Sequence, residues 1–174
     1  SLSKRACNLI KEFGPKAKED VERKRCTKEV ELIIQTNILL TGLIAGLGKE
    51  RCRSLAAHAL NYAMTSITGN NSALHGEKVA FGVIMQLILE NRDKDEIEKL
   101  LKLYSLLGLP LTLEEIGLIN EEVLKSVVKA ILQQKRRMNN LPFPVDEDMV
   151  YKALLKADEW GRKKMRNKRR CLNP

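Results

Sequence analysis

The sequence predicts an all-α fold, a helical bundle, on three observations. Aromatic residues make up only 4% of the 174 residues, so Leu, Ile, Ala and Val must fill the core. That composition suits packed helices better than a β-sandwich. Apolar residues recur at helical spacing in most segments, and no alternating strand pattern of useful length occurs. The chain is long enough for one domain with a core of reasonable size.

Three helical or charged segments are predicted in the first third of the chain. Residues 3–13 form a short amphipathic pattern, which Gly14 and Pro15 are expected to end because both are helix stop signals. Residues 16–26 are mostly charged and are interpreted as a solvated helix or linker. Residues 30–47 are apolar nearly all round, which predicts a helix buried at the centre of the domain. No apolar run is judged to reach the roughly 20 residues of a membrane span, so no membrane is expected as a partner.

The remaining helices are predicted from turn and capping signals. Residues 55–67 form one helix, and a turn at 69–72 leads into a strongly apolar one. The later helix starts are marked by the N-cap residues Asp93, Thr112, Asn120 and Asp146, with a short helix from Thr112 to Gly117. Residues 1–161 are therefore interpreted as a single helical domain, and residues 162–174 as a basic tail.

The net charge of +9 is concentrated in two clusters, residues 135–137 and 162–170. Such clusters neutralise phosphates or bind anionic membranes in other proteins. A solvated, partly disordered tail is the favoured interpretation, because no aromatic residue is interleaved with its charges and no nucleic-acid-binding fold accompanies it. Nucleic acid is therefore not expected as a partner.

The cysteines and the chain start bear on the compartment. Four cysteines show no paired spacing and no C-x-x-C, which excludes a zinc ribbon and favours free thiols in a reducing compartment. No signal-peptide pattern opens the chain, so a cytoplasmic location is expected. The start at Ser1, without a Met, suggests a processed, trimmed or fragmentary chain.

The only two histidines, His58 and His75, lie on neighbouring predicted helices joined by a turn. Two imidazoles placed in this way could share one metal ion. The alternative is a pair of ordinary core or surface histidines, since this spacing matches no standard zinc template.

Four segments resemble a known family in the right order. Residues 74–82, LHGEKVAFG, resemble the metal-binding helix of the iron-containing alcohol dehydrogenases, most closely that of the glycerol dehydrogenases. Residues 56–59 resemble that family's other histidine helix, and residues 103–118 and 139–145 resemble later segments. The resemblance runs over residues 27–161. It implies the helical bundle of the C-terminal domain of glycerol dehydrogenase (dehydroquinate synthase-like), without that domain's first helix.

The resemblance implies a zinc or iron ion held by one Asp and two His. His58 and His75 match the two histidines, whereas the family's Asp belongs to the missing first helix. Asp20 is the nearest upstream carboxylate, and Glu77 is interpreted as a helix-start carboxylate or a partner of a ligand. With two ligands the metal is expected to be weakly held or absent. No Gly-rich cofactor loop occurs, so NAD is expected only with a separate cofactor domain, and no catalytic residue is assigned.

Two departures from the family pattern leave the function open. Asn61 stands where the family has a further histidine, and KERCRS at residues 49–54 replaces a Gly- and Ser-rich stretch near the substrate. One hypothesis is the metal-binding domain of an NAD-dependent glycerol (polyol) dehydrogenase, inactive alone. A second is a degenerate, non-catalytic helical interaction module, and a third is a nucleic-acid-associated protein using its basic tail. A cofactor-domain chain or a homo-oligomer is the expected partner, covering an exposed apolar face.

Overall fold

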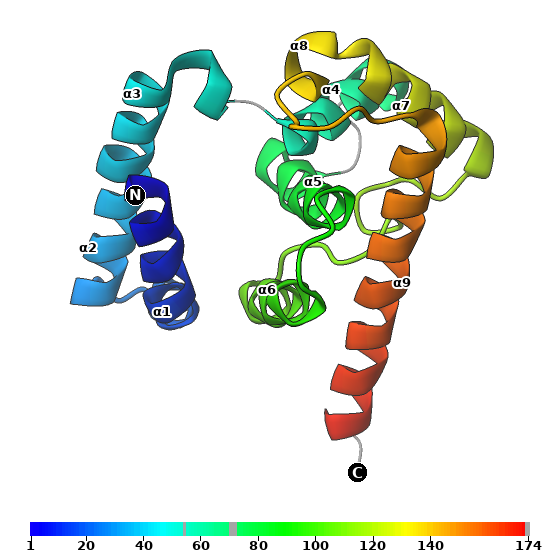
Figure 1. Ribbon diagram of the computed structural model, residues 1–174. Coiled ribbons are helices and arrows are strands. Elements are labelled where there is room, and N and C mark those ends of the chain that lie inside the picture. Colours follow the sequence, from blue (N-terminus) through cyan, green and yellow to red (C-terminus); the bar gives the residue numbers. More distant parts are fainter. Residues whose placement is uncertain (54, 70–72, 173–174) are drawn as a thin grey trace. The chain divides into compact units, whose positions relative to one another are not determined.

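The computed structural model describes residues 1–53, 55–69 and 73–172, and these form helices joined by turns and irregular connections, without any strand (Figure 1). The prediction of an all-α fold is confirmed. The helices are α1 (Leu2–Glu22), α2 (Lys28–Gln35), the π-helix η1 (Thr36–Leu40), α3 (Thr41–Arg53), α4 (Ala56–Thr68), α5 (His75–Leu89), α6 (Lys94–Leu107), α7 (Glu121–Gln133), α8 (Lys135–Met138) and α9 (Glu147–Leu172). The chain divides into two compact units, Ser1–Arg53 (unit 1) and Ser54–Pro174 (unit 2). The assignment of residues 1–161 to one domain and 162–174 to a tail stays a prediction.

Unit 1 is a helical hairpin in which α1 packs along the continuous helix formed by α2, η1 and α3 (Figure 1). The prediction that Gly14 and Pro15 end the first helix is wrong, because α1 runs through both to Glu22. Ion pairs one turn apart stabilise its second half, among them Lys18 with Glu22 and Arg23 with Glu19. Gly14 is buried, so its small size suits the packing of α1.

Asp20 holds the end of α1 against the start of α2. Its side chain is 1% exposed, and its Oδ1 lies 2.9 Å from Lys16 Nζ and 3.0 Å from Arg25 Nη2. Thr27, the N-cap of α2, donates its hydroxyl to Asp20 Oδ2 at 3.1 Å. The hydrogen bond from Lys16 is the main reason that the pKa of Asp20 is lowered, with Thr27 and the charges of Lys16 and Arg25 acting against burial. The carboxylate is thus already engaged within unit 1.

The apolar helix of unit 1 is largely exposed, which contradicts the prediction that residues 30–47 are buried. Only 11% of its most apolar window is buried, because α1 covers one side alone. The exposed large side chains are Ile34, Ile38, Leu39, Leu43 and Leu47. Lys28–Gly48 is also long and apolar enough, by length and composition, to cross a membrane, so the expectation that no such run exists is corrected. Core helices of soluble proteins pass the same test.

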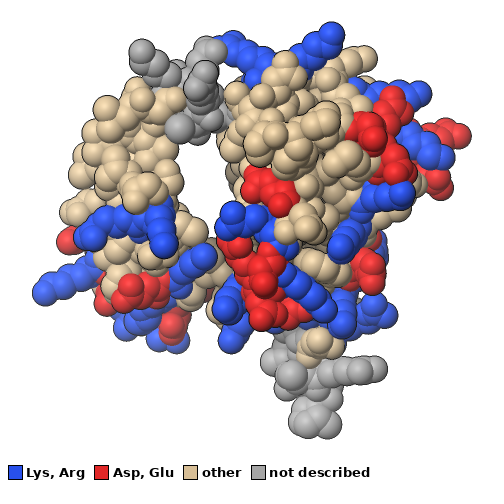
Figure 2. Space-filling model, in the orientation of Figure 1, with Lys and Arg blue, Asp and Glu red and all other residues tan. Residues whose placement is uncertain are grey.

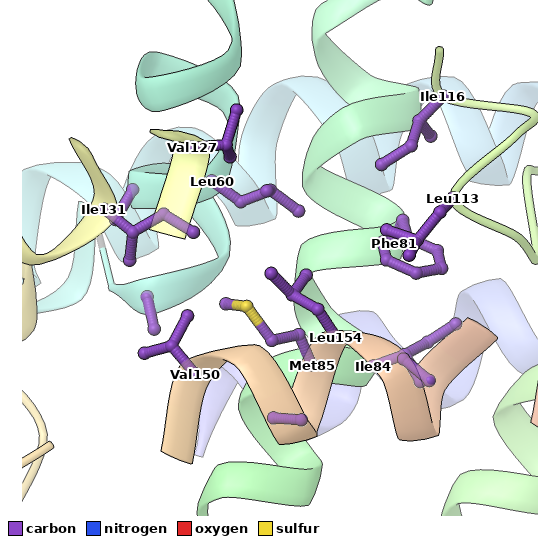
Figure 3. Close-up of a cluster of buried hydrophobic side chains, with 14 of the residues drawn as sticks. Leu60, Phe81, Ile84, Met85, Leu113, Ile116, Val127, Ile131, Val150 and Leu154 are labelled. Atoms are coloured by element: carbon purple, nitrogen blue, oxygen red, sulfur yellow. The ribbon is translucent and has the colours of Figure 1, made fainter. Parts of the chain in front are cut away.

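Unit 2 contains the main hydrophobic core, which lies among α4, α5, α7 and α9 (Figure 3). Its fully buried side chains come from all four helices and from the connection after α6. They include Leu60, Phe81, Ile84, Met85, Ile116, Val127, Ile131, Val150 and Leu154. Burying a side chain of this size contributes about 1.5–3 kcal/mol. This core fixes α4 and α5 next to each other, and these are the helices that carry the two histidines.

Most predicted helix ends in unit 2 are confirmed by side-chain hydrogen bonds. Asp93 Oδ1 accepts from Asp95 N (2.7 Å), Asn120 Oδ1 from Glu122 N (2.8 Å) and Asp146 Oδ1 from Met149 N (2.8 Å). The predicted short helix from Thr112 to Gly117 does not form, and residues 113–117 are turns. Glu115 Oε2 accepts hydrogen bonds from the backbone N–H groups of Leu111 and Thr112, and these bonds stabilise the turns before α7.

α9 is tied to this turn segment along its middle. Asp158 Oδ1 accepts from Leu113 N at 2.8 Å, and Arg162 pairs with Asp158 (2.7 Å) and Glu114 (3.5 Å). Gly161 lies so close that a Cβ atom there would be 1.7 Å from the carbonyl oxygen of Leu111. Residues 162–172, interpreted from the sequence as part of a basic tail, form the last turns of α9.

Candidate metal site

A close approach of α4 and α5 creates the candidate site. A Cβ atom at Gly82 would lie 2.5 Å from the carbonyl oxygen of Ala57, so only glycine allows the two helices to come this near. Gln86 Oε1 accepts a hydrogen bond from Ala57 N at 3.2 Å, satisfying a free N–H group in the first turn of α4. The start of α4 is therefore fixed on α5, and the next residue is His58.

His58 and His75 come together at this junction, as the pattern of two neighbouring helices predicted. Their ring centroids are 5.9 Å apart and their planes are inclined by 51°. His75 is the first residue of α5, and His58 is half-buried on α4. Leu74 N donates to Glu77 Oε2 at 2.7 Å, so the interpretation of Glu77 as a helix-start carboxylate is confirmed.

The separation of the two rings suits a shared metal ion. Two imidazoles bonded to one zinc at about 2.0–2.1 Å place their ring centroids roughly 5–6 Å apart. The spacing of 5.9 Å falls in that range. The ring spacing is therefore compatible with two imidazoles sharing one ion.

The surroundings of His58 favour its neutral form, because they lower the pKa of its imidazole. Burial lowers its pKa most, and the nearby His75 and the positive charge of Arg137 lower it further. A neutral imidazole is the form that binds a metal. The sequence analysis did not single out Arg137, which it counted only as part of a basic cluster. On α8 it stacks over the ring of Tyr62 at 3.8 Å and donates to Gln134 Oε1 at 2.7 Å.

The third ligand of the family pattern has no counterpart in the part of the chain that the structure describes. No group of three or more His, Cys, Asp or Glu is placed there to hold a metal ion. Asn61, three residues after His58 on α4, is 6% exposed and has no acid–base function near neutral pH. The side chains of residues 49–54 lie outside the described ones, so the departure predicted there is not tested.

The chain matches curated dehydrogenases over part of their length. It is 37% identical to the glycolaldehyde reductase of Halobacterium salinarum over 164 residues, and 36% identical to the glycerol dehydrogenase of Thermotoga maritima over 164 residues. The glycerol dehydrogenase of Escherichia coli is 36% identical over 166 residues. These matches cover 93–94% of this chain but 44% of each relative, so the chain spans less than half of their length. No family model matches the chain.

Solved structures agree with this relationship. A probable glycerol dehydrogenase from Sinorhizobium meliloti superimposes with a TM-score of 0.81 at 31% identity, covering 93% of this chain and 45% of the other. The glycerol dehydrogenase of Schizosaccharomyces pombe gives a TM-score of 0.84 at 27% identity, covering 96% and 43%. The helical fold described above is shared with part of each of these structures.

Proposed function

The chain is homologous to the glycerol dehydrogenases over more than nine-tenths of its length, and from this relationship we propose its function. We propose that it is the metal-binding helical domain of an NAD-dependent dehydrogenase acting on glycerol or a related polyol. The observation that carries this proposal is the histidine pair, His58 and His75, held 5.9 Å apart by the α4–α5 junction. A resemblance of sequence alone would not require the two rings to meet.

The roles proposed for the residues follow from their chemistry. A bound zinc or iron would supply polarisation of the substrate's alcohol oxygen, which favours hydride transfer to NAD. His58 and His75 would provide two neutral nitrogen ligands, and the lowered pKa of His58 supports that role. A third ligand would come from water or from a part of the protein outside this chain. We propose that catalysis also requires a cofactor-binding domain, in the same protein or in a partner chain of the cytoplasm.

Metal content tests the proposal. The purified chain is incubated with zinc or ferrous iron, desalted and analysed by elemental mass spectrometry, beside a His58→Ala, His75→Ala variant. We expect the parent chain to retain metal, at less than one equivalent because only two ligands lie in this chain, and the variant to retain none. A Cys7→Ala, Cys26→Ala variant serves as the control, because both thiols are free and exposed and could bind metal adventitiously. Equal metal in the parent and the double-histidine variant would contradict the assignment.

A second candidate function is a non-catalytic interaction module of the same ancestry. The observation that favours it is Arg137, whose positive charge acts on His58 and would oppose a bound cation. On this alternative the parent chain takes up no metal. Adding zinc would then leave the thermal midpoint unchanged in the parent chain as well as in the double-histidine variant.

A further inference from the structure

The last turns of α9 form a continuous basic helix. Residues 162–170 contain seven Lys or Arg and no Asp or Glu. They continue the helix that packs on the core of unit 2 and extend it past α6 (Figure 1). At 1.5 Å per residue, residues 162–172 are about 16 Å long. These basic residues therefore belong to the C-terminal end of α9, and the N-terminal part of the same helix packs in the core of unit 2.

This segment differs from the other helices of unit 2 in having seven basic residues within nine positions, with no acidic residue among them. Elsewhere in unit 2, acidic and basic side chains lie beside each other (Figure 2). Examples one helical turn apart are Arg92 with Glu96, Lys125 with Glu121 and Lys152 with Asp148. Among the side chains of α9 that the structure describes, Arg162 is the last with an ion pair, to Asp158 and Glu114.

Beyond Arg162 the pairing stops. Across the residues that the structure places, no carboxylate lies within ion-pair distance of Lys163, Lys164 or Arg166. Lys163 and Arg166 are exposed. Their charge is available to an external anion.

We propose that this segment of α9 binds the phosphodiester backbone of nucleic acid, independently of any dehydrogenase function. Seven of the nine residues 162–170 are basic, and successive residues of an α-helix are about 100° apart around its axis, so the sequence places basic positions on every face of the helix. A helix about 10–12 Å wide fits the major groove of B-form DNA, where phosphates lie on both sides of it. Charge on all sides suits that position better than a flat, one-sided surface.

An anionic membrane fits the same segment less well. A helix that lies in a membrane surface needs an apolar face that enters the acyl boundary. Between Arg162 and Leu172 the only apolar residues are Met165, Cys171 and Leu172, and they form no continuous stripe. We therefore commit to nucleic acid, and vesicles become a control for the experiment.

The test measures binding of the full chain to a labelled 20-base-pair DNA duplex and to a labelled 20-nucleotide RNA strand by fluorescence anisotropy. Titrations between about 50 and 200 mM salt give the slope of log K against log salt. Lys163→Gln, Lys164→Gln, Arg166→Gln is the test variant, because Gln keeps the helix propensity and removes three charges. Lys94→Gln, Lys99→Gln, Lys102→Gln on the exposed side of α6 removes the same charge and is the control.

The expected results are specific. The parent binds the duplex, and its slope falls by about 2.7 in the test variant, at about 0.9 per phosphate contact. Affinity at 50 mM salt drops at least about tenfold, and the α6 variant behaves as the parent. Tighter binding of the RNA strand would identify single strands as the source of the phosphates.

Three results would overturn the proposal. One is the absence of binding to either nucleic acid at 50 mM salt. Another is an equal loss of affinity in the α6 variant, which would mean that net charge alone acts. The third is binding to vesicles containing phosphatidylserine that is tighter than binding to nucleic acid.

Discussion

Replacing Gly161 with alanine should disrupt the packing of α9 against the segment before α7. Among the glycines whose added Cβ contacts are known, Gly161 has the shortest contact. The new Cβ atom would lie 1.7 Å from the carbonyl oxygen of Leu111 and 2.6 Å from its carbonyl carbon. Real Cβ contacts are not shorter than 3.0 Å, so α9 would have to move by at least about 1.3 Å. The obstacle is backbone, which has no rotamer to change.

The size of the effect follows from what that displacement breaks. The hydrogen bond from Leu113 N to Asp158 Oδ1, now 2.8 Å, would stretch to about 4 Å and be lost. An unsatisfied buried donor costs about 1–3 kcal/mol, and overpacking costs typically 1–3 kcal/mol. Alanine in a helix returns about 1 kcal/mol relative to glycine. We therefore expect the free energy of unfolding of unit 2 to fall by about 1–5 kcal/mol, with a central value of about 3 kcal/mol or roughly 10 °C in thermal midpoint.

The assay uses the single tryptophan, Trp160, which precedes Gly161 on α9 and reports on this helix directly. Urea unfolding is followed by its fluorescence for the parent and for Gly161→Ala. Gly76→Ala on α5 is the matched control, because a Cβ there meets nothing within 4 Å. It should leave the midpoint unchanged or raise it. A Gly161→Ala protein as stable as the parent would refute the close contact between α9 and Leu111.

Two further predictions concern titrating groups. The pKa of His58 is lowered from 6.5 in the folded chain, so below pH 6.5 the unfolded state binds a proton that the folded state does not. The free energy of unfolding of the metal-free chain should therefore decrease as the pH falls below 6.5. The urea midpoint of His58→Gln should lack that decrease. Urea midpoints that depend on pH identically in the parent and the variant would contradict this prediction. The pKa of Asp20 is lowered from 3.8, so its contribution is present above that pH and is lost as the pH falls through the folded value. Asp20→Asn should destabilise unit 1 at pH 7, which would be measured as faster hydrogen exchange of the α1 amides. Glu22→Gln removes an exposed ion pair and should not change that exchange. Equal exchange in both variants would argue against a stabilising role of the Asp20 hydrogen bonds and ion pairs.

Local signals predicted the fold well. The N-caps Asp93, Asn120 and Asp146 could be recognised because a cap depends on a few neighbouring residues. Pro15 was misinterpreted because the packing and ion pairs that sustain α1 beyond it come partly from other segments.

Properties that depend on non-local contacts were not predictable in the same way. The apolar composition of residues 30–47 indicated a helix correctly but not how much of it a neighbour would cover. The meeting of His58 and His75 was expected from the turn between their helices, whereas Arg137 reaches His58 from α8, far along the chain. The sequence therefore did not indicate that the positive charge of Arg137 would lie near His58.

The π-helix η1 has a consequence for how the unit 1 helix can change in evolution. One residue of an α-helix corresponds to a rotation of about 100° about its axis. A π-turn accommodates one additional residue without breaking the helix, so deleting a single residue within Thr36–Leu40 would restore a regular helix there. The wide π-turn absorbs the rotation of the additional residue, so the deletion would leave both α2 and α3 with the faces that they now turn toward α1. Two relatives that differ by a one-residue gap at this point would therefore keep the same side chains of α2 and α3 in contact with α1.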